Sequence, residues 1–338
     1  LAPSPAAIDA AAAKYFPGHE DTAPGKRLFR LTRRQLDATV AWLLPGYAPA
    51  PLAERMPRDP LQTNFEYAEL LSLNAANMAP LTGWIGEIAA RVKAAPEKLF
   101  ACPGATPAPD CLERTARAFI AKALRAEITP ERVDRFTAFF VEGAKTVGLG
   151  QAVGELVEVV LNSPAFLFRA ELESDRRGRL SPAQLLQAIT YTLADLPPGA
   201  VGYDAAREKL VRFFHTWLEV REPAELPVSR EVFPELTPRL AAAMVEETDR
   251  FLRAKLAGPS PALDDITQAR ASFVSQTLAP IYGVKSTDPT GKATIPLDPA
   301  QRLGIFSQAA VIASHSGPTN TRLVKRGAFW VRKVMCME

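Results

Sequence analysis

A polar segment near the C-terminal end, residues 314–326, carries the side chains best suited to chemistry. It combines the imidazole of His315 with hydroxyl side chains and with the cations Arg322, Lys325 and Arg326. Two interpretations stay open: the hydroxyls satisfy the backbone of a capped turn, or the segment binds an anion or a partner protein at a helix start. We expect a polar turn leading into the last helix, with His315, Arg322, Lys325 and Arg326 as candidate partner-binding or anion-binding residues.

The cations of this segment bear on the kind of partner. Positive side chains in the first turn of a helix oppose its macrodipole, so an acidic partner surface or a bound anion would compensate them. The alternative is that these cations only solvate the helix. No acid or base partner for a nucleophile is identifiable in the sequence near His315. The catalytic residues therefore stay unknown, and we lean towards a protein that is not an enzyme.

Two other clusters carry titratable groups. Glu246, Glu247 and Asp249 stand close together, but neighbours on a helix point in different directions, so we expect a solvated acidic face and not a metal site. His215 lies between Phe214 and Trp217. We expect a half-buried, satisfied histidine there, with a ligand or catalytic base as the alternative.

The familiar catalytic signatures are absent from the sequence. There is no phosphate-binding G-x-x-x-x-G-K-[ST] loop, no G-x-S-x-G turn, no G-x-G-x-x-G and no H-E-x-x-H. There is also no C-x-x-C-H for covalent haem and no Glu-x-x-His pair of a di-iron bundle. We predict no cofactor and no metal in this chain.

Cys102 and Cys111 flank a loop that contains three prolines and one glycine. A disulfide across about ten residues would contribute roughly 2.5–3 kcal/mol on the chain-entropy model. Free buried thiols remain an alternative. A zinc site is the least favoured reading, because it needs about four closely spaced ligands and no histidine is near. Cys336 is the odd cysteine.

Composition indicates a globular chain. Of 338 residues, 47% are hydrophobic and 23% charged, which excludes wholesale disorder, and the net charge of +3 is too small to indicate a nucleic-acid binder. No uninterrupted apolar run is long enough for a transmembrane helix. The first residues show no basic and apolar leader, so we expect that a targeting signal was removed or never present.

The elements that must position these residues are mainly helices. Capping signals mark expected helix starts at Thr32, Ser181-Pro182, Thr237-Pro238 and Asp298-Pro299. Much of the proline content is thus explained by prolines at the first position of a helix. We expect a mainly α, multi-helical fold of two packed helical halves, residues 1–163 and 164–338, with Pro-rich loops and at most a small hairpin at 286–296. The expected helices span 5–16, 32–44, 76–94, 110–126, 130–146, 150–162, 182–194, 203–219, 238–257, 268–280, 299–307 and 319–335.

Several short motifs follow one another in an order that resembles a known group of proteins. They are FRLTRRQL at 29–36, the 102–111 cysteine loop, LNSPAFLFR at 161–169, RLSP at 179–182, FFHTWL at 213–218, FPEL at 233–236 and VKRGAFW at 324–330. This order is similar to the large extracytoplasmic proteins of planctomycetes and myxobacteria built from domains of unknown function 1587, 1595, 1592 and 1588. The chain departs from their usual pattern at 317–322, where Pro-Thr-Arg-Thr followed by Ser-Pro is expected.

The resemblance implies a location and a kind of partner. Relatives of this group often carry a C-x-x-C-H segment or a cytochrome-like domain, so it implies an extracytoplasmic protein, periplasmic or associated with the outer membrane, and other protein subunits as partners, including a c-type cytochrome. An oxidising compartment favours the Cys102–Cys111 disulfide.

The sequence indicates only general classes of function. We expect a helical scaffold or interaction module of a larger assembly, without nucleic acid or a transmembrane segment. The alternative is a redox or electron-transfer component whose haem lies on a partner or on a continuation of the chain. A hydrolase or binding protein that uses the His315 cluster is the third interpretation.

Overall fold

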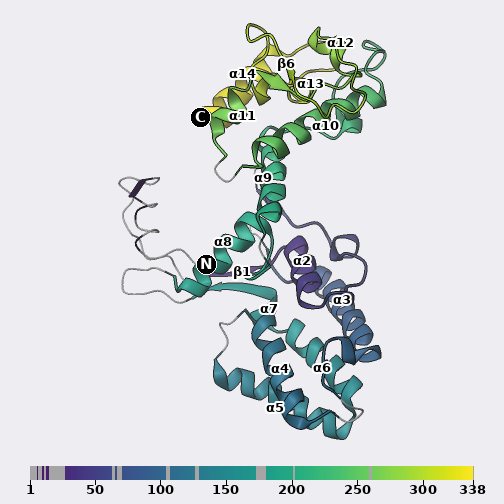
Figure 1. The fold of residues 1–338 in the computed structure, drawn as a ribbon, viewed down its shortest axis with the longest axis vertical. Helices are drawn as coiled ribbons and strands as arrows, with labels where there is room; N and C mark the ends of the chain where they lie inside the picture. Colours follow the sequence, from purple (N-terminus) through teal and green to yellow (C-terminus); the bar gives the residue numbers. More distant parts are fainter. Residues whose placement is uncertain are drawn as a thin grey trace. The chain divides into compact units, whose positions relative to one another are not determined.

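The computed structural model describes residues 6, 10, 13–14, 27–62, 65–66, 71–103, 107–125, 129–172, 180–200, 202–258 and 261–337. These residues form two compact units, 1–202 and 203–338 (Figure 1). Each unit is mainly helical, which confirms the expected fold class. The expected helix at 5–16 lies outside the described residues except for isolated positions.

The first unit is a helical bundle with a short sheet. Its central helix, α6, packs against α3 on one side and α5 on another, and α4 packs on α5. A β-carbon at Gly154 of α6 would lie 3.1 Å from the Ala89 carbonyl oxygen of α3, so the glycine permits this close approach. The elements are β1 (Arg27–Arg30), α2 (Arg33–Leu43), β2 (Leu61–Gln62), β3 (Phe65–Glu66), α3 (Ala75–Ala94), α4 (Pro109–Ala123), α5 (Pro130–Thr146), α6 (Leu149–Leu161), α7 (Pro164–Leu167), β4 (Phe168–Glu171) and α8 (Pro182–Ala194).

The start of α2 is fixed by local hydrogen bonds and a buried ion pair. Thr32 and Gln35 form the expected capping box, each side chain bonded to the other's backbone N–H. Arg30 and Asp59 are both buried, and the guanidinium donates to Asp59 Oδ1 over 2.6 Å. The second oxygen, Asp59 Oδ2, accepts from the Arg33 backbone N–H, so the carboxylate ties β1 to the first turn of α2.

Strands β1 and β4 pair in antiparallel register, with Arg27 opposite Glu171 and Arg30 opposite Phe168. This pairing brings residues after position 164 into the first unit, and Tyr191 of α8 is buried in the same core. The chain passes from the first unit to the second at Gly202–Tyr203, whereas the sequence suggested a boundary at 163–164.

A buried arginine holds this region together. Arg125, just after α4, donates to the carbonyl oxygens of Ala165, Phe166 and Phe168 over 2.6–2.8 Å and to the Tyr191 hydroxyl over 3.1 Å. These bonds satisfy backbone carbonyl groups at the turn between α7 and β4. The LNSPAFLFR motif is therefore a structural corner.

The second unit consists of two longer helices covered by short elements. One apolar cluster includes Phe214, Leu218, Phe251 and Phe329, and another lies between α10, α12 and α13. The elements are α9 (Tyr203–Trp217), α10 (Pro238–Lys255), α11 (Leu263–Thr267), β5 (Ala271–Ser272), α12 (Ala279–Tyr282), β6 (Ile295–Pro296), α13 (Ala309–Ser314) and α14 (Leu323–Phe329), which continues as a π-helical turn at Trp330–Val334.

Three expected helices of this unit are wrong or displaced. Residues 268–280 do not form one helix, because Ala269 and Arg270 offer their carbonyl oxygens to the backbone N–H groups of Gly304 and Leu297. At 299–307 only a 3₁₀ turn, Ile305–Ser307, is present. The last helix begins at Leu323 and not at 319, and α13 was not expected.

The turn expected within 286–296 is present. The Asp288 carboxylate accepts hydrogen bonds from the Thr290 hydroxyl and from the backbone N–H groups of Thr290, Lys292 and Ala293, which lower the pKa of Asp288. The strand after it, β6, pairs with β5 and not within the loop.

Candidate partner-binding site

The structure places His315 inside the second unit. This residue is 3% exposed, its Nε2 lies 2.9 Å from the Leu218 carbonyl oxygen, and its ring packs on Phe329 with 4.2 Å between centroids. Burial lowers the pKa of His315, so the imidazole is neutral at pH 7 and its Nε2–H donates to Leu218. His315 therefore joins the end of α13 to the end of α9 and presents no surface to a partner.

The three cations of the segment differ in exposure. Arg322 precedes α14 in a left-handed backbone conformation and is exposed, whereas Lys325 and Arg326 are half-buried. Lys325 Nζ donates to the Ser314 carbonyl oxygen over 3.3 Å, so it closes the polar turn. Within the described part of the chain, none of the three forms an ion pair with a carboxylate. Of the four predicted residues, Arg322 and Arg326 are thus the ones whose side chains form no hydrogen bond or ion pair among the described residues.

An exposed apolar stripe runs along α14 and its π-helical turn. Residues that are seven or eight positions apart in a helix lie on the same side of it. The α14 stripe consists of Leu323, Val324, Trp330, Val331 and Met335, which are 73%, 87%, 43%, 39% and 58% exposed. An amphipathic helix normally buries such a stripe, and contiguous exposed apolar surface marks interaction sites.

The opposite side of α14 is firmly held. Phe329 is buried, and the Trp217 indole Nε1–H donates to the Lys333 carbonyl oxygen over 3.0 Å. Trp330, a member of the stripe, is held as well, because its partly exposed ring packs against Phe306 at a tilt of 45° with 4.5 Å between centroids. The stripe is therefore presented by an anchored helix.

The loop after α9 lies against the polar turn. The backbone N–H of Arg221 donates to Ser314 Oγ over 3.0 Å, and the backbone N–H of Ser229 donates to the Pro318 carbonyl oxygen over 2.9 Å. These contacts connect residues 218–229 to residues 314–318, which are about a hundred positions later in the chain.

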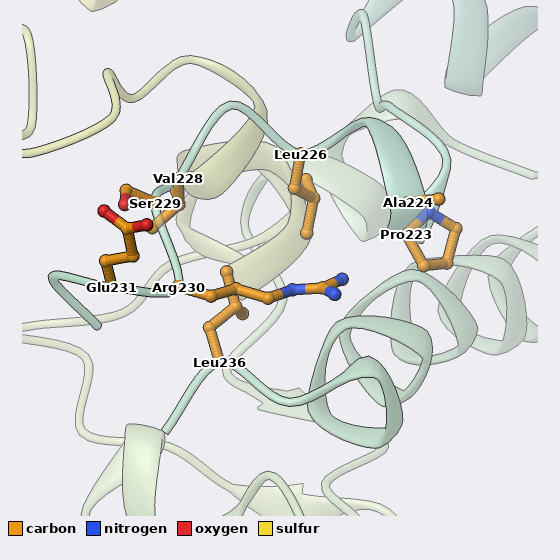
Figure 2. Close-up of a pocket in the computed structure, with 8 residues that line it drawn as sticks. All are labelled: Pro223, Ala224, Leu226, Val228, Ser229, Arg230, Glu231 and Leu236. Carbon is orange, nitrogen blue, oxygen red and sulfur yellow. The ribbon is translucent and has the colours of Figure 1, made fainter. Parts of the chain in front are cut away.

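A pocket of about 520 Å³ opens on this loop (Figure 2). Its apolar walls include Leu226 and Leu236, and the extended Arg230 side chain runs between them in Figure 2. The carboxylate of Glu231 is directed away from the Arg230 guanidinium in Figure 2. A cation over apolar walls is suited to a carboxylate carried on an apolar segment. Sequence reasoning missed this pocket, because no motif marks it. The lining residues are Pro223, Ala224, Leu226, Val228, Ser229, Arg230, Glu231 and Leu236.

The acidic cluster on α10 is not uniformly solvated, which corrects the expectation. Glu247 is 2% exposed because it falls on the inward stripe of α10. Its oxygens accept hydrogen bonds from Ser272 Oγ over 2.5 Å and from the Tyr282 hydroxyl over 2.7 Å. Burial raises the pKa of Glu247 to about 7 despite these bonds. Tyr282 in turn accepts from the Ala309 N–H, so the network joins α10, β5, α12 and α13.

His215 is half-buried, as expected. Its Nε2 lies 3.7 Å from Asp249 Oδ1 and has no hydrogen-bond partner within the described residues, so its polar atoms are not all satisfied. Burial lowers the pKa of His215, and the Asp249 carboxylate acts in the opposite direction. Burial outweighs the Asp249 carboxylate, so His215 is neutral at pH 7.

The first unit contains the Cys102–Cys111 disulfide, with 6.0 Å between the α-carbons. Cys336 is free and exposed. The described residues contain no cluster of three His, Cys, Asp or Glu side chains placed to hold a metal ion. They also contain no helix long and apolar enough to cross a membrane.

Comparison with protein families agrees with part of the resemblance. Residues 111–171 match a family described as a protein of unknown function (DUF1595), and residues 180–284 match another of that description (DUF1592). No curated protein matches the chain, and no solved structure does. The corner bound by Arg125 lies in the first matched region and the Glu247–Tyr282 network in the second. Two regions of the chain thus match, in sequence order, the DUF1595 and DUF1592 models, two of the domains that its motifs resemble.

Proposed function

We propose that this chain is an extracytoplasmic interaction module that joins a larger protein assembly through the α14 stripe. The observation that carries the proposal is the exposure of Leu323 and Val324, at 73% and 87%, on a helix whose other side is anchored. Apolar side chains exposed to this degree lose contact with water when a partner covers them, which favours binding.

The charges beside the stripe indicate the chemistry of the partner. Arg322 and Arg326 have no carboxylate partner among the described residues, and the Arg230 guanidinium stands in the neighbouring loop. Cations at the rim of an apolar interface favour an acidic partner and speed its approach. The partner we propose is therefore an acidic protein subunit with an apolar groove.

The proposed cellular location rests on the disulfide. A disulfide such as Cys102–Cys111 persists in an oxidising compartment and is rare in the reducing cytosol. This supports an extracytoplasmic location, periplasmic or associated with the outer membrane. Among partners, a c-type cytochrome subunit is the candidate suggested by the domain resemblance.

Site-specific photo-crosslinking tests the proposal. A photoreactive residue replaces Val324 in the full chain, in the cells that produce it. The control replaces Leu263, which is 58% exposed in the same unit and belongs neither to the stripe nor to the pocket lining. The proposal predicts one adduct of discrete mass from position 324 that is absent from position 263. Equal adducts from both positions, or none from 324, would overturn it. A haem absorption band in the adduct would identify the partner as a cytochrome.

A further inference from the structure

A second candidate surface lies on the first unit, away from every residue used above. A groove of about 260 Å³ opens on α5 and α6 and is lined by Arg132, Arg135, Phe136, Phe139 and Val159. Phe139 is 45% exposed and Val159 is 43% exposed, so the floor of the groove is apolar and open to water.

Phe136 of the lining packs against the core of the first unit, whereas Phe139 lies outside the buried side of α5. Thr137 and Phe140 form the buried side of α5, and Phe140 packs on Phe100 with 5.0 Å between ring centroids. Phe139 is adjacent in sequence and therefore projects about 100° around the helix from Phe140. An exposed Phe at this position contributes little to folding, and it forms the floor of a groove instead of standing alone.

The charges at the groove are all of one sign. Arg132 and Arg135 are three residues apart on α5, a spacing that places them on the same side of the helix. Of the other charged side chains of α5, Asp134 pairs with Arg117, Lys145 pairs with Glu142, and Glu131 forms hydrogen bonds at the helix start. Within the described ranges neither Arg132 nor Arg135 has a carboxylate partner.

We propose that this α5–α6 groove binds an acidic peptide segment of a partner protein. One large apolar side chain of the segment enters between Phe139 and Val159, and flanking carboxylates meet the guanidinium groups of Arg132 and Arg135. Guanidinium groups bind carboxylates in a two-pronged geometry, and Phe and Arg together are typical of the residues that dominate binding. The volume of about 260 Å³ suits one side chain and not a larger ligand.

Fluorescence anisotropy of the full chain with a labelled synthetic peptide tests this proposal. The probe alternates Glu with Phe and Leu, and its control carries Gln in place of every Glu. We expect the acidic peptide to bind at least about tenfold more tightly than the Gln peptide at low salt. The double variant Arg132→Gln/Arg135→Gln should lose that preference, and Phe139→Ser should weaken binding of both peptides.

A charge-matched control separates the groove from the net charge. Arg58→Gln/Arg114→Gln removes the same charge from two other exposed positions of the first unit. Binding that is unchanged in this control supports the groove. Equal losses in the two double variants, or no preference for the acidic peptide, would overturn it. Neither result bears on the α14 stripe, because no residue is shared.

Discussion

The Tyr282 hydroxyl donates a hydrogen bond of 2.7 Å to Glu247 Oε2, and both residues are buried in the second unit. The Ser272 hydroxyl donates a hydrogen bond to the other carboxylate oxygen, Glu247 Oε1, and the Ala309 N–H donates to the Tyr282 hydroxyl oxygen. One carboxyl group therefore connects elements from Pro238 to Ser314. Such a group costs free energy in its ionised form, because burial removes its hydration.

The first prediction concerns the pH dependence of stability. The folded pKa of Glu247, about 7, is raised above the ordinary value of 4.5. Its contribution to stability is thus fully present below about pH 4.5 and is lost as the pH rises through about 7. Glu247→Gln cannot ionise. We expect the free energy of unfolding of the wild type to fall by about 2 kcal/mol relative to Glu247→Gln between about pH 5 and pH 8.

Urea denaturation of both proteins across this range measures the difference. Comparing the two proteins cancels the titration of His215 and His315, whose pKa values are both lowered by burial. A constant difference across the range would show that Glu247 does not titrate there.

The second prediction contrasts two glycines. Gly304 has φ +56°, and a β-carbon there would lie 2.0 Å from the Thr267 carbonyl oxygen, so Gly304→Ala should destabilise the second unit by about 3 kcal/mol or more. At Gly317 the nearest atom, at 2.6 Å, is Nε of the exposed Arg322 side chain, which can move. Gly317→Ala should cost under about 1 kcal/mol. Thermal unfolding measures both, and similar effects would contradict the backbone contact at Gly304.

The third prediction concerns Arg125. Arg125→Met leaves the carbonyl oxygens of Ala165, Phe166 and Phe168 without their donor, and we expect a loss of about 3 kcal/mol in the first unit. The exposed Arg114→Gln serves as control and should change stability by less than about 0.5 kcal/mol. Hydrogen exchange should show faster exchange in β1 and β4 of Arg125→Met alone. Unchanged protection there would argue against a structural role.

Local signals predicted the helix starts well. The capping box at Thr32 and the caps at Ser181 and Thr237 are confirmed, because the cap and the first turn lie within a few residues of each other. Long-range contacts could not be predicted in this way. Strand β1 pairs with residues about 140 positions away, and each strand is too short for a clear pattern.

In the candidate site, too, local features could be predicted from the sequence and long-range contacts could not. Arg322 and Arg326 were found from their charge, but the burial of His315 depends on Leu218 and Phe329 from other parts of the unit. The sequence led us to expect a solvated Glu247, because it stands next to Glu246 in an acidic run. The structure places Glu247 among the buried residues of α10. The exposure of Leu323 and Val324 could not be predicted, since apolar helix residues are normally buried.

The fourth prediction concerns the disulfide. The bond closes a loop with a sequence separation of 9, and the double variant Cys102→Ser/Cys111→Ser should lower the free energy of unfolding by roughly 2–3 kcal/mol. Intact mass after alkylation without reductant should show Cys336 as the modified thiol. Modification of Cys102 and Cys111 in the native, unreduced protein would contradict the bond.

The most direct test of the interaction module is the salt dependence of its binding to the crosslinked partner. Arg322→Gln/Arg326→Gln should weaken association about tenfold at about 0.05 M salt and little at about 0.5 M, whereas Leu323→Asp/Val324→Asp should weaken it at both. The control Arg239→Gln/Lys285→Gln removes two exposed cations elsewhere in the second unit. The account predicts wild-type affinity for this control. Wild-type affinity of the α14 variants at low salt would contradict it.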